Sequence, residues 1–543
     1  MNRCICIHGH FYQPPRENPW LEAIEQQDSA FPHHDWNARV TDECYRPNAR
    51  SRMLDDDGRI QRIVNNYEQI SFNFGPTLLS WIEIHDREVY EAILEADRRS
   101  QERFDGHGSA LAQAHGHMIM PLANQRDRRT QVRWGIRDFE TRFGRKPEGM
   151  WLPETAVNTD TLETLAEHGI RFTVLAPGQA RRARRKDDDT WRDLHGDIDP
   201  SRPYDIELPS GRHIAAFFYD GPISQAVAFE QLLNSGRGFA QRLLTGFSDE
   251  RDRPQLVHIA TDGETYGHHH RHGDMALAAA IEYIHAQDDV ELINYAAYLE
   301  RFPPGHVAKI VEDSSWSCAH GIERWRSDCG CHTGGQPGWN QAWRQPLRDA
   351  LDWLRDELAT RFEHDARHHL EHPWNARDHY IDILLDRTPE RLRSFFADHG
   401  RRSLRPTDQV RVLKLLELQR HAMLMYTSCG WFFNELSGIE TVQVLHYAGR
   451  AIQLAEELFQ CDLEPRFLER LERAKSNIPE EGTGRDIFVN KVRPAMIDLQ
   501  KVGAHYAISS LFEEYDSNTS IYCYDVTLEQ SVRRSAGKVQ LHA

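Results

Sequence analysis

Long apolar runs are missing from this sequence. Nowhere in its 543 residues is there an uninterrupted apolar stretch of about 18 residues, the length that a membrane-spanning helix needs. The apolar run at residues 4–7 is far shorter than the apolar part of a secretory signal and is typical of a buried strand. We therefore expect a cytoplasmic protein.

An excess of positive charge is also missing. The chain has 65 Lys and Arg against 83 Asp and Glu, which gives a formal net charge of −18. A protein that binds nucleic acid regardless of sequence, or an anionic membrane, needs a field of Lys and Arg. We therefore expect neither partner, whereas the charge does not exclude a neutral substrate.

Cysteine is sparse and unevenly spaced. The nine cysteines are an odd count and are scattered along the chain, so they predict no disulfide framework. One cluster contains Cys318, Cys329, Cys331 and His332, but its spacing differs from the paired CxxC pattern of most zinc sites. We expect reduced thiols in a glycine-rich loop, and no metal or other cofactor.

The sequence does contain a regular alternation of apolar runs and amphipathic stretches over its first 300 residues. This alternation is typical of an α/β fold with a parallel sheet, and a barrel is the expected large version. The predicted strands are residues 4–7, 70–74, 109–113, 149–151, 172–175, 213–219, 256–260 and 291–294. The expected domains are a catalytic barrel (1–300), a Trp/Gly/Cys-rich connecting loop (301–345), a helical domain that completes the cleft (346–500) and the start of a β-rich tail (501–543).

Four polar loops follow four of the predicted strands. They contain His8 and His10, His115 and His117, Trp151 and Glu154, and the stretch "DGETYGHHH" that begins at Asp262. In an α/β barrel the chemistry lies at the carboxyl ends of the strands. The loops are therefore expected to meet at one mouth, with Glu154 facing Asp262.

Two chemistries fit these residues. Two carboxyl groups across a sugar ring are typical of glycoside hydrolysis. Asp262 with His268, His269, His270 and His272 also fits metal-dependent deacetylation, although adjacent histidines point in different directions. A purely structural interpretation remains as well, because a Glu after a Pro often begins a helix and an Asp before a Gly often caps a turn.

Taken together, the four loops resemble glycoside hydrolase family 57. The matching motifs are "HGHFYQPP", "HMIMPL", "WLPE" and "DGETYG", and "FFYDGPISQAVAF", with Asp220, is similar to a further family segment. The resemblance implies a (β/α)7-type barrel followed by an α-helical domain. It also implies a retaining activity on α-glucans of the amylase, 4-α-glucanotransferase or branching type, with Glu154 as nucleophile and Asp262 as general acid/base.

The sequence departs from the family pattern in two places. The second region lacks the acidic residue that many members carry after the glycine, here Gly108, and three histidines follow Gly267. Both changes touch the expected substrate subsites rather than the catalytic pair. The helical half resembles an uncharacterised branch with its own C-terminal region.

Sugar rings stack on aromatic faces and need polar partners at the rim. We therefore expect Trp316 and Trp431 to line the cleft, with Trp431 on a second wall formed by the helical domain; the alternative is that Trp431 belongs to a core. The full set of expected substrate-binding residues is His8, His10, His117, Trp151, Asp220, Glu264, His268, Trp316 and Trp431. Two other functions remain as alternatives, a metal-dependent polysaccharide deacetylase or zinc mannosidase, and a non-catalytic glucan-binding protein.

Overall fold

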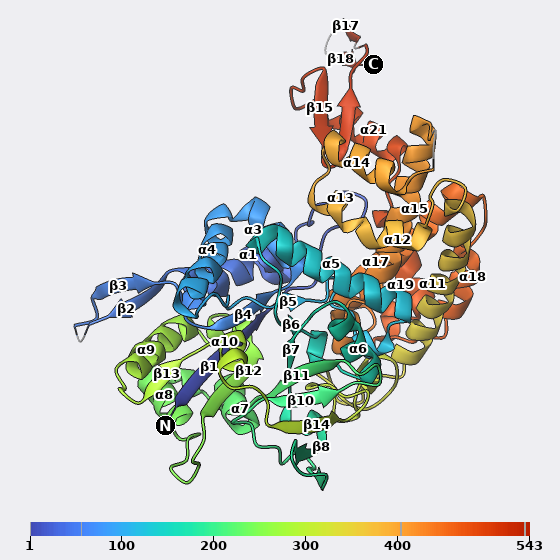
Figure 1. Cartoon of the computed structure of the whole chain (residues 1–543). Coiled ribbons are helices and arrows are strands. Elements are labelled where there is room, and N and C mark those ends of the chain that lie inside the picture. Colours follow the sequence, from blue (N-terminus) through green and yellow to red (C-terminus); the bar gives the residue numbers. More distant parts are fainter. Residues whose placement is uncertain (1, 56, 402–403, 531, 537–538, 543) are drawn as a thin grey trace.

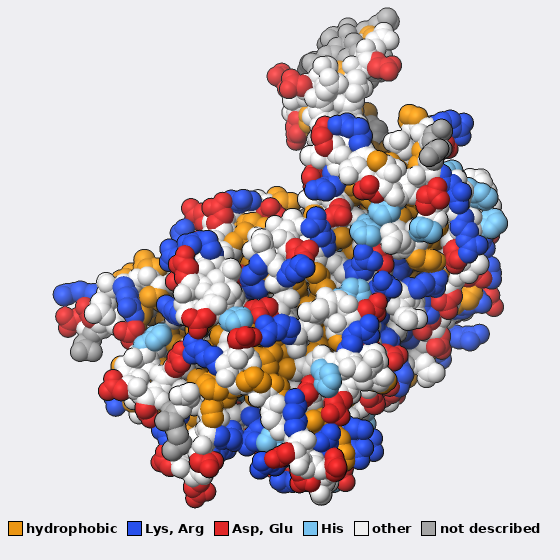
Figure 2. Space-filling model, viewed as in Figure 1, with side chains coloured by type: hydrophobic (Ala, Val, Ile, Leu, Met, Phe, Trp, Pro, Cys, Tyr) orange, Lys and Arg blue, Asp and Glu red, His pale blue; other side chains and the backbone are white. Residues whose placement is uncertain are grey.

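The structure is a computed structural model that describes the chain except residues 1, 56, 402–403, 531, 537–538 and 543. It confirms an α/β barrel followed by a helical domain, which lie side by side in Figure 1. Among the residues described, no helix combines the length and the apolar character needed to span a bilayer. Acidic and basic side chains are interspersed over the face shown in Figure 2.

Seven strands form the barrel wall. In order around the barrel they are β1 (Arg3–Phe11), β4 (Ser71–Phe74), β5 (Ala112–Gln113), β6 (Met150–Trp151), β7 (Phe172–Leu175), β11 (His213–Phe218) and β12 (Gln255–Asp262). Short bridges connect β4 to β5 and β6 to β7, and a hydrogen bond of 2.8 Å from the Asp220 N–H to the His258 carbonyl connects β11 to β12. All these neighbouring ladders run parallel, so the carboxyl ends of the strands share one rim.

β1 forms hydrogen-bonded ladders on both of its sides. It pairs with β12 on one side and with β4 on the other, and β13 (Val290–Leu292) pairs with its first residues. Its burial is nearly continuous, as expected of a parallel strand covered on both faces. The register places His10 beside Asp262 and beside Asn73, which brings the ends of three strands together.

Helices cover the outside of the barrel between successive strands. They are α3 (Pro76–His85), α4 (Arg87–Arg103), α5 (Gln125–Phe143), α6 (Thr159–Glu167), α7 (Gly221–Phe229), α8 (Gly236–Leu244), α9 (Gly273–His285) and α10 (Tyr295–Arg301). On the far side of β11, the strands β10 (Tyr204–Glu207), β14 (His306–Ile310), β8 (Ala180–Arg185) and β9 (Arg192–Asp193) continue the sheet away from the barrel.

The helical domain has its own apolar core. Its helices are α11 (Arg344–Ala366), α12 (Pro373–His379), α13 (Ile381–Leu385), α14 (Pro389–His399), α15 (Pro406–Leu424), α16 (Cys429–Phe432), α17 (Ile439–Phe459) and α18 (Glu464–Leu471). Barrel residues such as Met118 and Trp134 belong to this core too. Met118 also forms an antiparallel bridge with Thr427, so the loop after β5 is joined directly to the helical domain.

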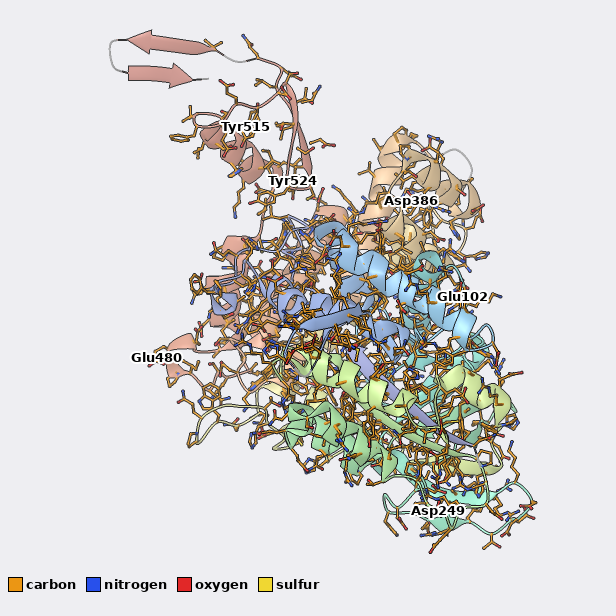
Figure 3. The ribbon with its side chains drawn as sticks, turned by 90° about the vertical axis from the view of Figure 1, so that its left-hand side faces the viewer. Glu102, Asp249, Asp386, Glu480, Tyr515 and Tyr524 are labelled. Carbon is orange, nitrogen blue, oxygen red and sulfur yellow. The ribbon has the colours of Figure 1, made fainter. Side chains whose placement is uncertain are left out.

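The last part of the chain projects from the body, as Figures 1 and 3 show for the segment around Tyr515 and Tyr524. Helix α21 (Leu499–Ser509) precedes the antiparallel pairs β15 (Asn518–Ile521) with β16 (Tyr524–Thr527) and β17 (Arg533–Ala536) with β18 (Val539–His542). The expectation of a β-rich tail from residue 501 was therefore wrong for 501–509, where helix α21 continues with most of its residues exposed.

Candidate active site

Polar side chains from β1, β4 and β5 form a hydrogen-bonded row at the rim of the barrel. The Asn73 amide N–H donates to Gln113 Oε1 at 2.7 Å, and its Oδ1 lies 3.1 Å from His8 Nε2. Asn73 also lies within hydrogen-bonding distance of His10 Nδ1. Burial lowers the pKa of His8 and of His10 to about 3, so both imidazoles are neutral at pH 7.

His117 connects this row to the helical domain. Its Nε2 lies 3.3 Å from His10 Nε2, and its Nδ1 lies 2.6 Å from Ser428 Oγ. The ring stacks on Tyr12 with centroids 3.6 Å apart. Since Ser428 comes from the helical domain, both halves of the chain build this part of the rim.

Glu154 stands on a sharp turn after β6. Its φ of 57° is left-handed, a conformation that is costly for a residue with a side chain and that is held here by the surrounding structure. Its Oε2 accepts hydrogen bonds from Trp316 Nε1 at 3.0 Å and from Ser317 Oγ at 2.7 Å. Desolvation raises the pKa of Glu154, although these two donors and the charge of Arg324 oppose the rise.

Asp262 is the last residue of β12 and is exposed to solvent. Desolvation of the carboxyl group is the main cause that raises its pKa to about 7, and the negative charge of Glu154 adds to the rise. Because the residue is open to solvent on one side, water screens part of this effect. His10 is paired with Asp262 in the register of β1 and β12, and its ring lies 6.4 Å from the ring of Trp316. Because Trp316 donates its indole N–H to Glu154, the two carboxylic residues lie on the same rim, although 108 positions separate them in sequence.

Aromatic rings line the rim beside Glu154. Trp151 stacks on His8 and on His10, with centroids 4.9 Å apart in both pairs. Trp316 meets Trp151 edge-on at 5.2 Å and is half-buried, so part of its ring faces solvent beside Glu154. The structure thus groups Trp151, Trp316 and both histidines of β1, all of which were expected to bind substrate.

Glu264 and His268, which were expected to bind substrate, form hydrogen bonds or ion pairs with other residues of the chain. Glu264 is buried, and its Oε1 accepts hydrogen bonds from the Tyr12 N–H at 2.9 Å and from the Tyr45 O–H at 2.6 Å. The His268 ring pairs with Glu43 and lies edge-on to Trp36 at 6.0 Å. Glu264 therefore fixes the chain after β1, while His268 attaches its loop to the segment that follows Trp36.

Two other expected substrate residues have structural partners. Asp220 caps α7, because its carboxylate accepts a hydrogen bond of 2.9 Å from the Ile223 N–H. Trp431 is 1% exposed and stacks parallel to Tyr426 at 6.3 Å within the core of the helical domain. The expectation that Trp431 lines the cleft was therefore wrong: the small residues before it allow close packing rather than an opening.

The three histidines that follow Gly267 form no metal site in the described part of the chain. His268 pairs with Glu43, and His270 Nε2 lies 3.0 Å from the Ala228 carbonyl. Among the described residues, the group with the geometry of a metal site is Cys318, His320, Cys329 and Cys331. The cluster predicted from the sequence contained His332, and this choice was wrong, because the ligand atom that lies close to the three thiols comes from His320.

Several residues of the candidate site were not predicted from the sequence. Asn73 and Gln113 are polar residues at the ends of predicted strands, and Tyr12 directly follows β1, so strand-end position was a usable signal for all three. Ser317 and Ser428 gave no such signal. Their contacts to Glu154 and His117 depend on segments more than 160 positions apart in the sequence.

Comparison with known proteins shows which protein families the chain resembles. A family model described as Glycosyl hydrolase family 57 matches residues 9–311, and one described as Domain of unknown function (DUF3536) matches 339–543. Alpha-amylase 1 of Dictyoglomus thermophilum is 27% identical over 106 residues, which cover 20% of this chain and only 15% of that protein.

Solved structures show the same architecture. The exo-type maltose-forming amylase from Pyrococcus sp. ST04 has a TM-score of 0.62 and 15% identity, covering 90% of this chain and 88% of that chain. The branching enzyme from Pyrococcus horikoshii has a TM-score of 0.52 and 16% identity, covering 92% and 99%. These likenesses establish the fold, and the first family match covers more than half of the sequence. The chain belongs to glycosyl hydrolase family 57.

Proposed function

We propose that the chain is a retaining glycoside hydrolase or transglycosidase that acts on α-glucans, with Glu154 as nucleophile and Asp262 as general acid/base. Membership of the family supports the glycosidase class. The similar proteins carry the names of an amylase, a maltose-forming amylase and a branching enzyme, and these names support the substrate class.

The observation that carries the proposal is the different surroundings of two neighbouring carboxyl groups. Glu154 accepts two hydrogen bonds, both of which favour its ionised form, whereas Asp262 has a pKa of about 7, raised in part by the charge of Glu154. Desolvation raises the pKa of both groups, but two hydrogen-bond donors oppose the rise at Glu154, whereas the charge of Glu154 adds to the rise at Asp262. These different surroundings suit one ionised nucleophile and one protonated acid.

The free oxygen of Glu154 suits nucleophilic attack. Both hydrogen bonds to its carboxylate go to Oε2, and no donor contacts Oε1 among the residues described. Oε1 would form a bond to the anomeric carbon as the glycosidic C–O bond breaks, and Asp262 would transfer its proton to the departing oxygen. In the second step Asp262 takes a proton from water or a sugar hydroxyl, whose oxygen displaces Glu154 from the anomeric carbon.

The finer activity depends on the acceptor. Water gives hydrolysis, whereas a sugar hydroxyl gives 4-α-glucan transfer or branching, and both use the same two carboxylates. A retaining mechanism requires the two carboxyl groups to stand about 5–5.5 Å apart when a sugar is bound. Analysis of the products from a pure maltooligosaccharide distinguishes hydrolysis from both forms of transfer.

Chemical rescue tests the proposal. We expect Glu154→Ala to lower kcat on a maltooligosaccharide aryl glycoside by about 10³-fold or more. Azide should restore turnover and give a glycosyl azide of inverted anomeric configuration, since it replaces the missing nucleophile. The matched control is Glu102→Gln, because Glu102 has an exposed carboxylate at the outer surface (Figure 3), and this variant should retain full activity.

Two results would contradict the proposal. One is full activity of Glu154→Ala, and the other is an inverted product from the wild-type enzyme. Tight binding of glucan by the wild-type protein without turnover on any α-glucan would favour the non-catalytic alternative instead.

A further inference from the structure

Two short pairs of soft ligands meet in the loop between the barrel and the helical domain. The first pair is Cys318 and His320, and the second is Cys329 and Cys331; within each pair, one residue separates the two ligands. Their ligand atoms all lie within 4.8 Å of one another. Gly330, between the second pair, has a φ of 78°, a left-handed turn that brings both thiols to the same side.

The distances within this cluster match the edges of a coordination tetrahedron. Cys318 Sγ lies 3.7 Å from Cys331 Sγ and 3.9 Å from Cys329 Sγ, and Cys331 Sγ lies 3.4 Å from His320 Nδ1. With Zn–S bonds of about 2.3 Å, the sulfur atoms around a tetrahedral zinc ion stand about 3.8 Å apart. The thiols are too far apart for disulfide bonds, which need about 2.05 Å between sulfurs.

A buried cation next to the cluster has no carboxylate partner. The Arg344 side chain is fully buried, and its Nη1 lies 3.9 Å from Cys329 Sγ and 3.2 Å from the Cys331 carbonyl oxygen. Its remaining hydrogen bonds go to carbonyl groups, and no Asp or Glu pairs with it in the described part of the chain. A buried charge usually needs a partner of opposite sign. Three thiolates and a neutral imidazole around Zn²⁺ carry a net charge of −1 and supply that partner.

We propose that Cys318, His320, Cys329 and Cys331 bind one zinc ion, which fixes the loop between the two halves of the protein. Three cysteines and one histidine make a closed set of four ligands, as in structural zinc sites, with no open position for a substrate. Cysteine sulfur and imidazole in a tetrahedron favour zinc over magnesium or calcium, which prefer oxygen ligands.

The position of the site explains what the ion would hold in place. Cys318 directly follows Trp316 and Ser317, the two donors to Glu154. Within the loop closed by the ligands, Trp325 Nε1 donates a hydrogen bond of 3.2 Å to the Ser428 carbonyl of the helical domain. The ion would thus clamp a segment that contacts both the barrel site and the helical domain, while taking no part in the chemistry.

Metal analysis of the full chain tests the proposal without an activity assay. The protein is purified under reducing conditions without a histidine tag and dialysed against metal-free buffer. We expect about one zinc ion per chain. After exchange with Co²⁺, tetrahedral sulfur ligation should give strong visible ligand-field bands and a near-ultraviolet thiolate-to-cobalt band.

Ligand variants locate the ion. We expect Cys329→Ser and His320→Ala to weaken zinc binding by about 100-fold or more in competition with a chelator, above the 10–100-fold typical of losing an outer partner. His332→Ala and Cys523→Ser, which change a neighbouring histidine and a cysteine outside the cluster, are matched controls and should keep the ion. Circular dichroism identifies variants that do not fold. If the ligand variants do not fold, the thiols of the wild-type protein are titrated with a mercurial instead, and zinc should be released in step with their modification.

Three outcomes would overturn the proposal. The first is that the folded wild-type protein holds no zinc even after incubation with zinc ions. The second is that the ligand variants keep zinc as well as the controls do. The third is that peptide mapping of the protein purified under reducing conditions still finds Cys318 in a disulfide. None of these results depends on whether Glu154 and Asp262 catalyse glycoside chemistry, so failure of one proposal leaves the other intact.

Discussion

The indole N–H of Trp316 donates a hydrogen bond of 3.0 Å to Oε2 of Glu154, across 162 positions of sequence. Ser317 donates to the same oxygen, so two consecutive residues of the connecting loop orient one carboxylate of the barrel. This loop is therefore part of the candidate active site as well as a link between domains.

Replacing Trp316 by Phe should change the acid side of the pH profile. The ring is largely retained, but the donor that lowers the pKa of Glu154 is lost, so this pKa should rise. Because a nucleophile must be ionised, the acidic limb of kcat/KM should move to higher pH. On that limb kcat/KM should fall about 10-fold for each unit by which the pKa rises. Trp191→Phe, on the outer β8–β9 hairpin, is the control; equal profiles for both variants would show that the hydrogen bond has no such role.

The wild-type enzyme should show a bell-shaped dependence of kcat/KM on pH. Activity should rise as Glu154 ionises and fall as Asp262 loses its proton, with the basic limb near pH 7. Asp262→Asn should remove the basic limb and lower kcat by about 10²–10⁴-fold on substrates with poor leaving groups. A basic limb that persists in Asp262→Asn would assign the acid to another residue.

Trp431→Ala should act on stability rather than on substrate binding. The indole is in the core of the helical domain, so its loss should lower the free energy of unfolding by about 3–5 kcal/mol. The KM of the remaining folded enzyme should not change. Phe433→Ala removes a nearby ring that is 41% exposed and should cost less than about 1 kcal/mol. A thermal melt and a kinetic assay on both variants check this, and a raised KM for Trp431→Ala with little destabilisation would restore the cleft interpretation.

Glu264→Gln should flatten the pH dependence of stability. Burial is the main cause that raises the pKa of Glu264 to about 8, so the folded protein retains a proton that the unfolded chain releases near pH 4–5. Stability from this group is full below the unfolded pKa and falls as pH rises towards 8, at up to about 1.4 kcal/mol per pH unit. Gln keeps the oxygen that accepts from Tyr12 and Tyr45 but cannot ionise. Denaturant unfolding at pH 5 and pH 8 should show a smaller difference for the variant than for the wild type; an equal difference would assign the effect elsewhere.

The sequence by itself determined the fold class and where functional groups would be found. The predicted strand at 172–175 coincides with β7, and the motifs of the family already place Glu154 and Asp262 after strands of a barrel. These features are local, because strand periodicity and the position of a residue at a strand end are properties of a few neighbouring residues.

Only the tertiary structure decided which side chains touch. It buried Trp431, paired His268 with Glu43, and selected His320 instead of His332 for the cysteine cluster. It also brought Trp316 to Glu154. Each of these outcomes depends on packing between segments or on a backbone turn such as the one at Gly330, and no local pattern of apolar and polar residues specifies contacts of that kind.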